Sequence, residues 1–186
     1  MTDNPNAPNK DGETPIHKAA RLEHTEIVRI LAPLTDNPNV PINYGQTPIS
    51  EAAWNGHIEI VKILAPLTDK PNAPNQYGST PIHKAAWHGY TEIVKILAPL
   101  TEYPNAPDNW GYTPIYMAAS NDQTEIVKIL APLAKNPNAP NKQGETPTSV
   151  TSNAEIRGIL KSFKNMFKKH NAGPSTEPSR KRSKKF

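Results

Sequence analysis

The chain has 186 residues, of which 35% are hydrophobic and none is cysteine, and its formal net charge is +4. The lack of cysteine excludes a disulfide framework, thiolate metal sites and thiol catalysis. No apolar run is long enough to cross a bilayer, and the polar N-terminus lacks a signal-peptide pattern, so we expect neither membrane insertion nor secretion.

The positive charge lies near the C-terminus. Residues 161–186 hold nine basic residues and one acidic residue, whereas residues 1–160 hold twelve basic and sixteen acidic residues. An acidic body binds a phosphate backbone poorly. Any nucleic acid or strongly acidic partner is therefore expected at the C-terminal segment.

A unit of 33 residues is repeated along the chain. Thr-Pro recurs at Thr14, Thr47, Thr80, Thr113 and Thr146, and the first four copies lead into Glu-Ile-Val-Lys/Arg-Ile-Leu-Ala-Pro-Leu. A fixed period of this length indicates a solenoid, because such units bury their apolar faces by stacking on their neighbours. This organisation favours an extended binding surface over an enclosed active site.

The pattern within a unit predicts a turn, a helix, a second turn and a second helix. In the third copy, Gly78 supplies the positive φ of a tight turn, Thr80 is a good N-cap and Pro81 suits the first helical position. Gly89 can end this helix, and a second helix begins near Thr91. That helix carries an apolar stripe with helical spacing, formed by Ile93, Val94, Ile96 and Leu97.

These residues resemble the ankyrin repeat. The matching motif is Gly-x-Thr-Pro-Ile-His-x-Ala-Ala-x-x-Gly followed by Glu-Ile-Val-Lys-Ile-Leu, and the resemblance covers about 160 of the 186 residues. It implies an all-α ankyrin-repeat solenoid of antiparallel helix pairs with projecting hairpin-like loops. It also implies that the loops and the first helices form a concave face, on which protein partners usually bind.

We expect an ankyrin-repeat domain over residues 1–168. It comprises four full repeats from about 10 to 141, then a truncated fifth repeat and a capping helix over 142–168. The first unit begins in mid-repeat, which leaves open that the chain is a fragment of a larger multi-domain ankyrin protein. A departure from the family pattern is the proline after each second helix, which should end or kink that helix, at Pro33, Pro66, Pro99 and Pro132.

Aromatic residues occupy positions that vary between the units and that the resemblance places on the concave side. Trp and Tyr dominate binding hot spots, because they bring a large contact area at little entropic cost. We therefore predict a partner-binding stripe formed by Tyr44, Trp54, Tyr77, Trp87, Trp110 and Tyr112. The alternative is that these side chains pack between helices and shield the loop backbone.

The histidines are the only conventional catalytic candidates, and their placement argues against catalysis. His17 and His83 occupy the structural histidine position of the repeat, which Ser50, Tyr116 and Ser149 fill in the other units. No metal-binding histidine pair, phosphate loop or nucleophile motif is present in the sequence. We expect no enzyme activity, no cofactor, no metal and no small-molecule substrate.

The end of the chain predicts a helix followed by a disordered basic tail. Ile159, Leu160, Phe163 and Phe167 continue a helical apolar stripe that should cover the end of the solenoid, or instead offer a basic amphipathic helix to a partner groove. Residues 169–186 have a composition that cannot form a core.

Two basic clusters in this region resemble a bipartite nuclear-localisation signal, read by a nuclear import receptor. They are formed by Lys168, Lys169, Arg180, Lys181, Arg182, Lys184 and Lys185. The alternatives are a solubilising tail or weak, non-specific nucleic-acid contact. The predicted function is a protein-interaction scaffold or adaptor in the nucleus, with the cytoplasm as the alternative location. A nucleic-acid-associated regulator that uses the tail is the other candidate function.

Overall fold

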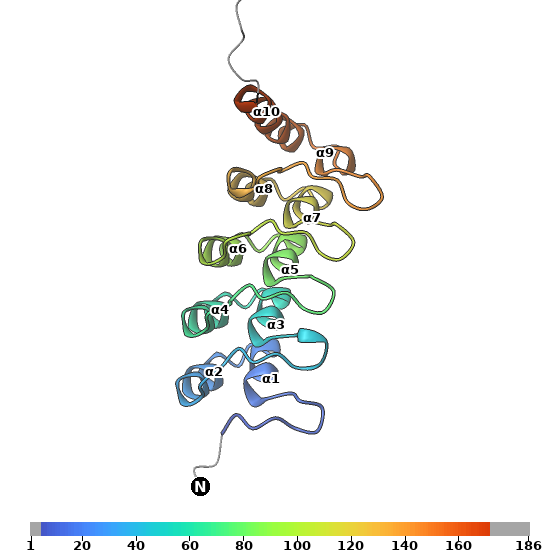
Figure 1. Ribbon diagram of the computed structural model, residues 1–186. Helices are drawn as coiled ribbons and strands as arrows, with labels where there is room; N and C mark the ends of the chain where they lie inside the picture. Colours follow the sequence, from blue (N-terminus) through green and yellow to red (C-terminus); the bar gives the residue numbers. More distant parts are fainter. Residues whose placement is uncertain (1–4, 172–186) are drawn as a thin grey trace, which may run out of the picture.

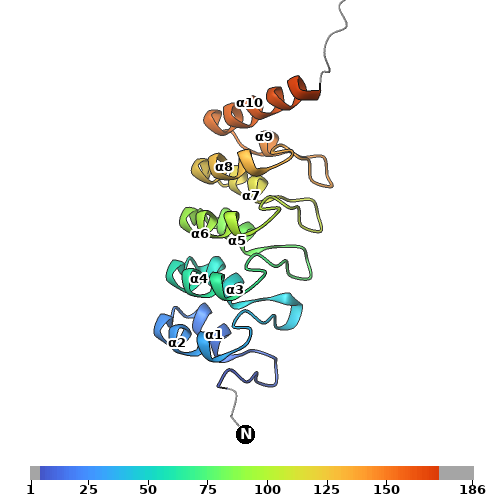
Figure 2. The same cartoon turned by 60° about the vertical axis from the view of Figure 1, so that its left-hand side comes forward.

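The computed structural model describes residues 5–171, and within that range the chain forms helices and turns without a strand. Helix pairs stack into one column, and the loop before each first helix projects to the same side of the column (Figure 1, Figure 2). The predicted all-α solenoid is confirmed. The predicted disordered tail covers residues 169–186: the backbone of 169–171 is helical, against that prediction, and residues 172–186 lie outside the described residues.

Each unit contributes one inner and one outer helix. The first helices of the units are α1 (Pro15–Arg21), α3 (Pro48–Asn55), α5 (Pro81–His88), α7 (Pro114–Ser120) and α9 (Pro147–Val150). The second helices are α2 (Thr25–Leu31), α4 (Ile58–Leu64), α6 (Thr91–Leu97), α8 (Thr124–Leu130) and α10 (Ala154–Asn171). Short 3₁₀ turns occupy Ala32–Leu34, Asn43–Gly45, Ala65–Leu67, Ala98–Leu100 and Ala131–Leu133.

Local sequence sets the helix boundaries. At the start of α5 the Thr80 side chain accepts a hydrogen bond from the His83 amide, and Pro81 follows as the first helical residue. The helix ends at Gly89, whose φ of 81° is left-handed. After α6 the chain tightens into a 3₁₀ turn that contains Pro99, which has no N–H for a further α-helical bond. The predicted effect of the proline on the second helix is confirmed.

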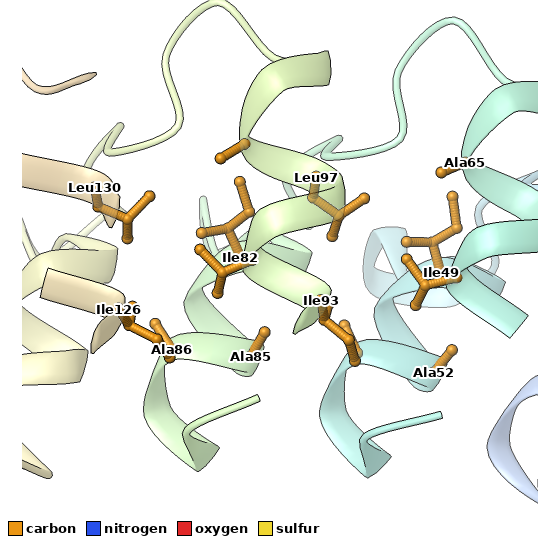
Figure 3. Close-up of a cluster of buried hydrophobic side chains, with 14 of the residues drawn as sticks. Ile49, Ala52, Ala65, Ile82, Ala85, Ala86, Ile93, Leu97, Ile126 and Leu130 are labelled. Carbon is orange, nitrogen blue, oxygen red and sulfur yellow. The ribbon is translucent and has the colours of Figure 1, made fainter. Parts of the chain in front are cut away.

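The core is a continuous layer of small and branched side chains between successive units (Figure 3). From the first helices come an isoleucine and an alanine pair, such as Ile82, Ala85 and Ala86, all fully buried. The second helices add isoleucine, valine and leucine, such as Ile93 and Leu97, also fully buried. The alanines let neighbouring helices approach closely, so each unit completes its core only against the next one.

The two ends of the column differ. At the C-terminal end α9 is only four residues long, and α10 covers the last unit with Ile156 and Leu160 fully buried. The backbone of α10 continues to Asn171, beyond the end at Lys168 predicted from the sequence. At the N-terminal end Ile27 is 45% exposed, whereas Ile60 at the same position of the second unit is fully buried.

Candidate partner-binding surface

The loops are joined to one another by backbone hydrogen bonds. In the third, fourth and fifth loops a backbone amide donates to the carbonyl of the tip residue in the preceding loop, with a distance of 2.9 Å for Gln76 to Tyr44, Asn109 to Tyr77 and Lys142 to Trp110. The loop tips are thereby held at regular spacing. The three tip residues that accept these bonds are three of the six aromatic residues predicted to bind a partner.

Each loop is also braced internally. In the third unit the Asn75 side chain accepts hydrogen bonds from the amides of Tyr77 and Ser79, both at 3.0 Å. Gly78 has a φ of +77°, and a Cβ there would lie 2.9 Å from the Asn109 amide nitrogen of the next loop. Glycine is required here both for the turn and for the close approach of the two loops.

The loop row of aromatic side chains is exposed. Tyr44, Tyr77 and Trp110 have exposed fractions of 65%, 43% and 47%. The rings of Tyr77 and Trp110 stack with their centroids 5.8 Å apart and their planes 25° apart. Backbone bonds fix the three tips, and stacking orients the rings of Tyr77 and Trp110, so these two side chains form a preorganised apolar platform.

A second row lies on the first helices. In the first unit Arg21 Nη2 is 2.8 Å from Glu13 Oε1, so the side chain seven residues after the N-cap threonine faces the base of the loop. Trp54 and Trp87 occupy this position in the second and third units and are 48% and 45% exposed. They therefore lie in the angle between the first helices and the loops, which we call the inner face.

Tyr112 differs from the other five predicted residues. It lies at the base of a loop, is half-buried, and packs against Tyr116 with a centroid distance of 4.9 Å. The other five residues come from two kinds of element, a loop row and a helix row, and no ring contact joins the two rows within the described residues.

Lys84 lies beside the helix row and was missed by sequence reasoning. Its Nζ is 2.6 Å from Gln46 Oε1 and 6.0 Å from the centroid of the Trp54 ring. Burial lowers the pKa of Lys84, and the charge of Glu51 opposes that effect. The available signal was the serine at position 50, which stands where the first and third units have histidine and leaves space next to the loop.

His83 shows the role of the histidine in a unit that has one at this position. Its Nδ1 accepts from the Thr80 amide at 3.1 Å, and its Nε2 donates to the Tyr112 carbonyl of the next loop at 3.0 Å. Burial lowers the pKa of this histidine to about 4, although the Tyr112 carbonyl favours the protonated form. The ring is neutral at pH 7 and connects two units, as expected for a structural residue.

The predicted localisation residues are only partly within the described chain. The backbone of Lys168 and Lys169 belongs to α10, whereas Arg180, Lys181, Arg182, Lys184 and Lys185 lie outside the described residues. Over residues 5–171 no group of three acidic or histidine side chains is arranged to hold a metal ion. Among the helices described, none combines the length and apolarity that crossing a membrane requires.

Comparison with known sequences agrees with the geometry. The model of a family described as "Ankyrin repeats (3 copies)" matches residues 2–75, 39–108 and 66–143 in overlapping registers. These matches together span most of the stacked units. A search of curated protein sequences gave no significant match.

Proposed function

We propose that this chain, which belongs to the ankyrin-repeat family, binds an extended segment of a partner protein along its inner face. Ankyrin repeats are protein–protein interaction modules, and proteins built from them are typically scaffolds without catalysis. The finer proposal concerns the place of binding. The partner lies between the loop row of Tyr44, Tyr77 and Trp110 and the helix row of Trp54 and Trp87, with Tyr112 at the base of the loops.

One observation carries this proposal: large aromatic side chains stay about half exposed at positions where the fold does not need them. Arg21 and Ser120 fill the position of Trp54 and Trp87 in the first and fourth units. All four units nevertheless have the same buried alanine pair in their first helices. The repeat therefore stacks without a tryptophan at this position, although the Trp54 ring also packs edge-on against His88 of the next unit, with a centroid distance of 4.5 Å. Exposed aromatic side chains clustered on one surface are typical of binding sites.

The test compares the chain with a triple variant, Trp54→Ala, Trp87→Ala and Trp110→Ala, in affinity capture from nuclear and cytoplasmic extracts. A matched control is Tyr103→Ala, because Tyr103 is 54% exposed and its ring lies beside Lys135, away from the inner face. We expect the triple variant to lose a partner that the control retains, with an affinity loss of about 2 kcal/mol or more per hot-spot residue. Circular dichroism checks that each variant is folded.

Two results contradict the proposal. If the folded triple variant captures the same proteins as the wild-type chain, the aromatic rows are not the binding surface. If the Tyr103→Ala variant also loses this partner, the loss of binding in the triple variant cannot be assigned to the inner face.

We also propose that the chain acts in the nucleus, brought there by an import receptor that binds the two basic clusters. The proposal rests on the sequence of Lys168–Lys169 and of residues 180–185. Two cationic clusters on one spacer suit a receptor with two acidic pockets, because the first contact raises the effective concentration of the second. A fluorescent fusion of the full chain should accumulate in the nucleus, and Lys181→Ala with Arg182→Ala should abolish the accumulation. Equal distribution of both fusions would contradict it.

A further inference from the structure

The units are tied together by side chains that reach from one first helix to the next loop. His17 Nε2 lies 3.3 Å from the Gln46 carbonyl oxygen, and His83 Nε2 lies 3.0 Å from that of Tyr112. In the fourth unit a hydroxyl does the same, with Tyr116 donating to a Glu145 carboxylate oxygen at 3.0 Å. Each of these contacts spans 29 residues.

The second unit lacks this connection, because its side chain at that position is Ser50. The serine hydroxyl is too short to reach the next loop and donates to Gln46 Oε1 of its own loop at 3.0 Å. The Lys84 side chain of the third unit fills the space instead, with Nζ 2.6 Å from Gln46 Oε1 and 3.3 Å from Ser50 Oγ. A cation thus stands where other units place a neutral ring.

This ammonium group has neutral partners only. Gln46 and Ser50 supply uncharged oxygens, and no carboxylate of the described residues forms an ion pair with Lys84. The charge of Glu51 raises the pKa of Lys84, but the two side chains form no ion pair. An ammonium has three N–H donors, and the structure gives acceptors to two. The third donor has no acceptor among the described residues, and no carboxylate there pairs with the charge.

Comparison along the repeats shows that this arrangement is local. The same position is held by Lys18, which is exposed, by Met117, which is half-buried, and by Glu51 and Val150. Met117 shows that the fold accepts an uncharged side chain of similar length here. The two hydrogen bonds of Lys84 join the second and third units, but a neutral donor could make them, so the stacking of the units does not require the positive charge.

The surroundings of Lys84 fit a ligand that is apolar with one acid. Trp54 belongs to α3 of the preceding unit, and the centroid of its ring is 6.0 Å from the Lys84 ammonium. Trp87 follows Lys84 by three residues on α5 and so lies on the same side of that helix. The body of the chain has more acidic than basic residues, which disfavours a strongly acidic partner. A single carboxylate within an otherwise apolar segment satisfies both conditions.

We propose that the partner segment carries one acidic side chain, whose carboxylate pairs with the Lys84 ammonium between Trp54 and Trp87. This rests on the proposed function and adds a requirement to it. The aromatic rows provide contact area, and the lysine fixes the register of the bound segment. A charge-assisted hydrogen bond is roughly twice as strong as a neutral one and has a defined direction, which suits this role.

The test selects binders from a displayed library of random peptides and identifies positions with a fixed residue. The full wild-type chain should enrich apolar peptides with Asp or Glu at one fixed position. The Lys84→Met variant should lose that preference. The matched control, Lys18→Met, changes the same position on α1, where the lysine is exposed, and should retain it. Lys84→Gln replaces Lys84→Met if circular dichroism shows that the latter is unfolded.

A double-mutant cycle on one selected peptide gives the decisive number. Changing the acidic residue of the peptide to its amide should weaken binding to the wild-type chain about tenfold or more. The same change should hardly alter binding to the Lys84→Met variant, because that variant already lacks the pair between the lysine and the carboxylate. The inference is overturned if the acidic residue contributes equally to binding of both chains, or if the selected peptides have no fixed acidic position. In either case the proposed binding through the tryptophans is unaffected. If the wild-type chain enriches no peptide, the inference and the proposed function both fail.

Discussion

At the scale of single residues, the buried histidines illustrate how one side chain joins two units. The neutral His83 ring accepts a hydrogen bond at Nδ1 and donates one at Nε2, so protonation would replace a good acceptor with a donor facing the Thr80 amide. The sequence predicted the structural role of His17 and His83 from their place in the repeat. It did not predict the role of Lys84, because the space left by Ser50 is visible only when the next unit is in place.

The first prediction concerns pH. His83 has a pKa of about 4 in the folded chain against 6.5 as the ordinary value, so the unfolded chain binds the proton more readily. Its contribution to stability is complete above pH 6.5 and is lost as the pH falls toward 4, at up to about 1.4 kcal/mol per pH unit. Urea unfolding between pH 7.5 and 5 should show this slope.

The control for this prediction is the His83→Gln variant, which should be less stable at pH 7 and show a shallower slope. Some slope should remain, because burial also lowers the pKa of His17. Parallel pH profiles for the variant and the wild-type chain would show that His83 is not the titrating group.

At the scale of elements, the loops are more ordered than their sequence suggests. The glycines and asparagines predict tight turns. The hydrogen bonds from each loop to the tip of the preceding one depend on how closely the units stack, which no single loop sequence encodes. Tyr44 illustrates the difference, since its φ of 64° is left-handed, a conformation that tyrosine rarely adopts. The division of the predicted stripe into two rows follows from the same loop geometry.

The second prediction compares alanine at two loop glycines. Gly78 and Gly144 have φ values of +77° and +83°, so the backbone strain of alanine is about equal, roughly 1–2 kcal/mol. A Cβ at Gly78 would lie 2.9 Å from the Asn109 amide nitrogen, whereas at Gly144 nothing lies within 4 Å. Gly78→Ala should therefore be more destabilising than Gly144→Ala by about 1 kcal/mol or more, because the next loop has to move.

Denaturant unfolding of both variants measures the difference, and amide hydrogen exchange locates it. Exchange at Asn109 should increase in Gly78→Ala, because its amide donates to the Tyr77 carbonyl at 2.9 Å. Equal stabilities of the two variants would mean that the contact between the loops contributes nothing.

At the scale of the whole molecule, the repeat period predicted the architecture, because a unit that recurs every 33 residues allows few arrangements other than stacking. Periodicity also indicated which faces are apolar. It could not show how much of each face is covered, since identical residues have different neighbours inside the column and at its ends. Among the four second helices with the common sequence, α2 has the most exposed face, with Ile30 63% exposed.

The last prediction compares two isoleucines that hold the same position of the repeat but differ in how much of the side chain is buried. Ile27 and Ile93 occupy the same helical position, so their helix propensities cancel in a comparison, but Ile27 is 45% exposed and Ile93 is fully buried. Ile93→Ala removes contacts with two units and leaves a cavity, at a cost of about 2–5 kcal/mol. Ile27→Ala removes about half as much buried surface and leaves no closed cavity, so it should cost about 1 kcal/mol. Urea unfolding followed by circular dichroism measures both. Similar losses would mean that another surface covers α2 in solution.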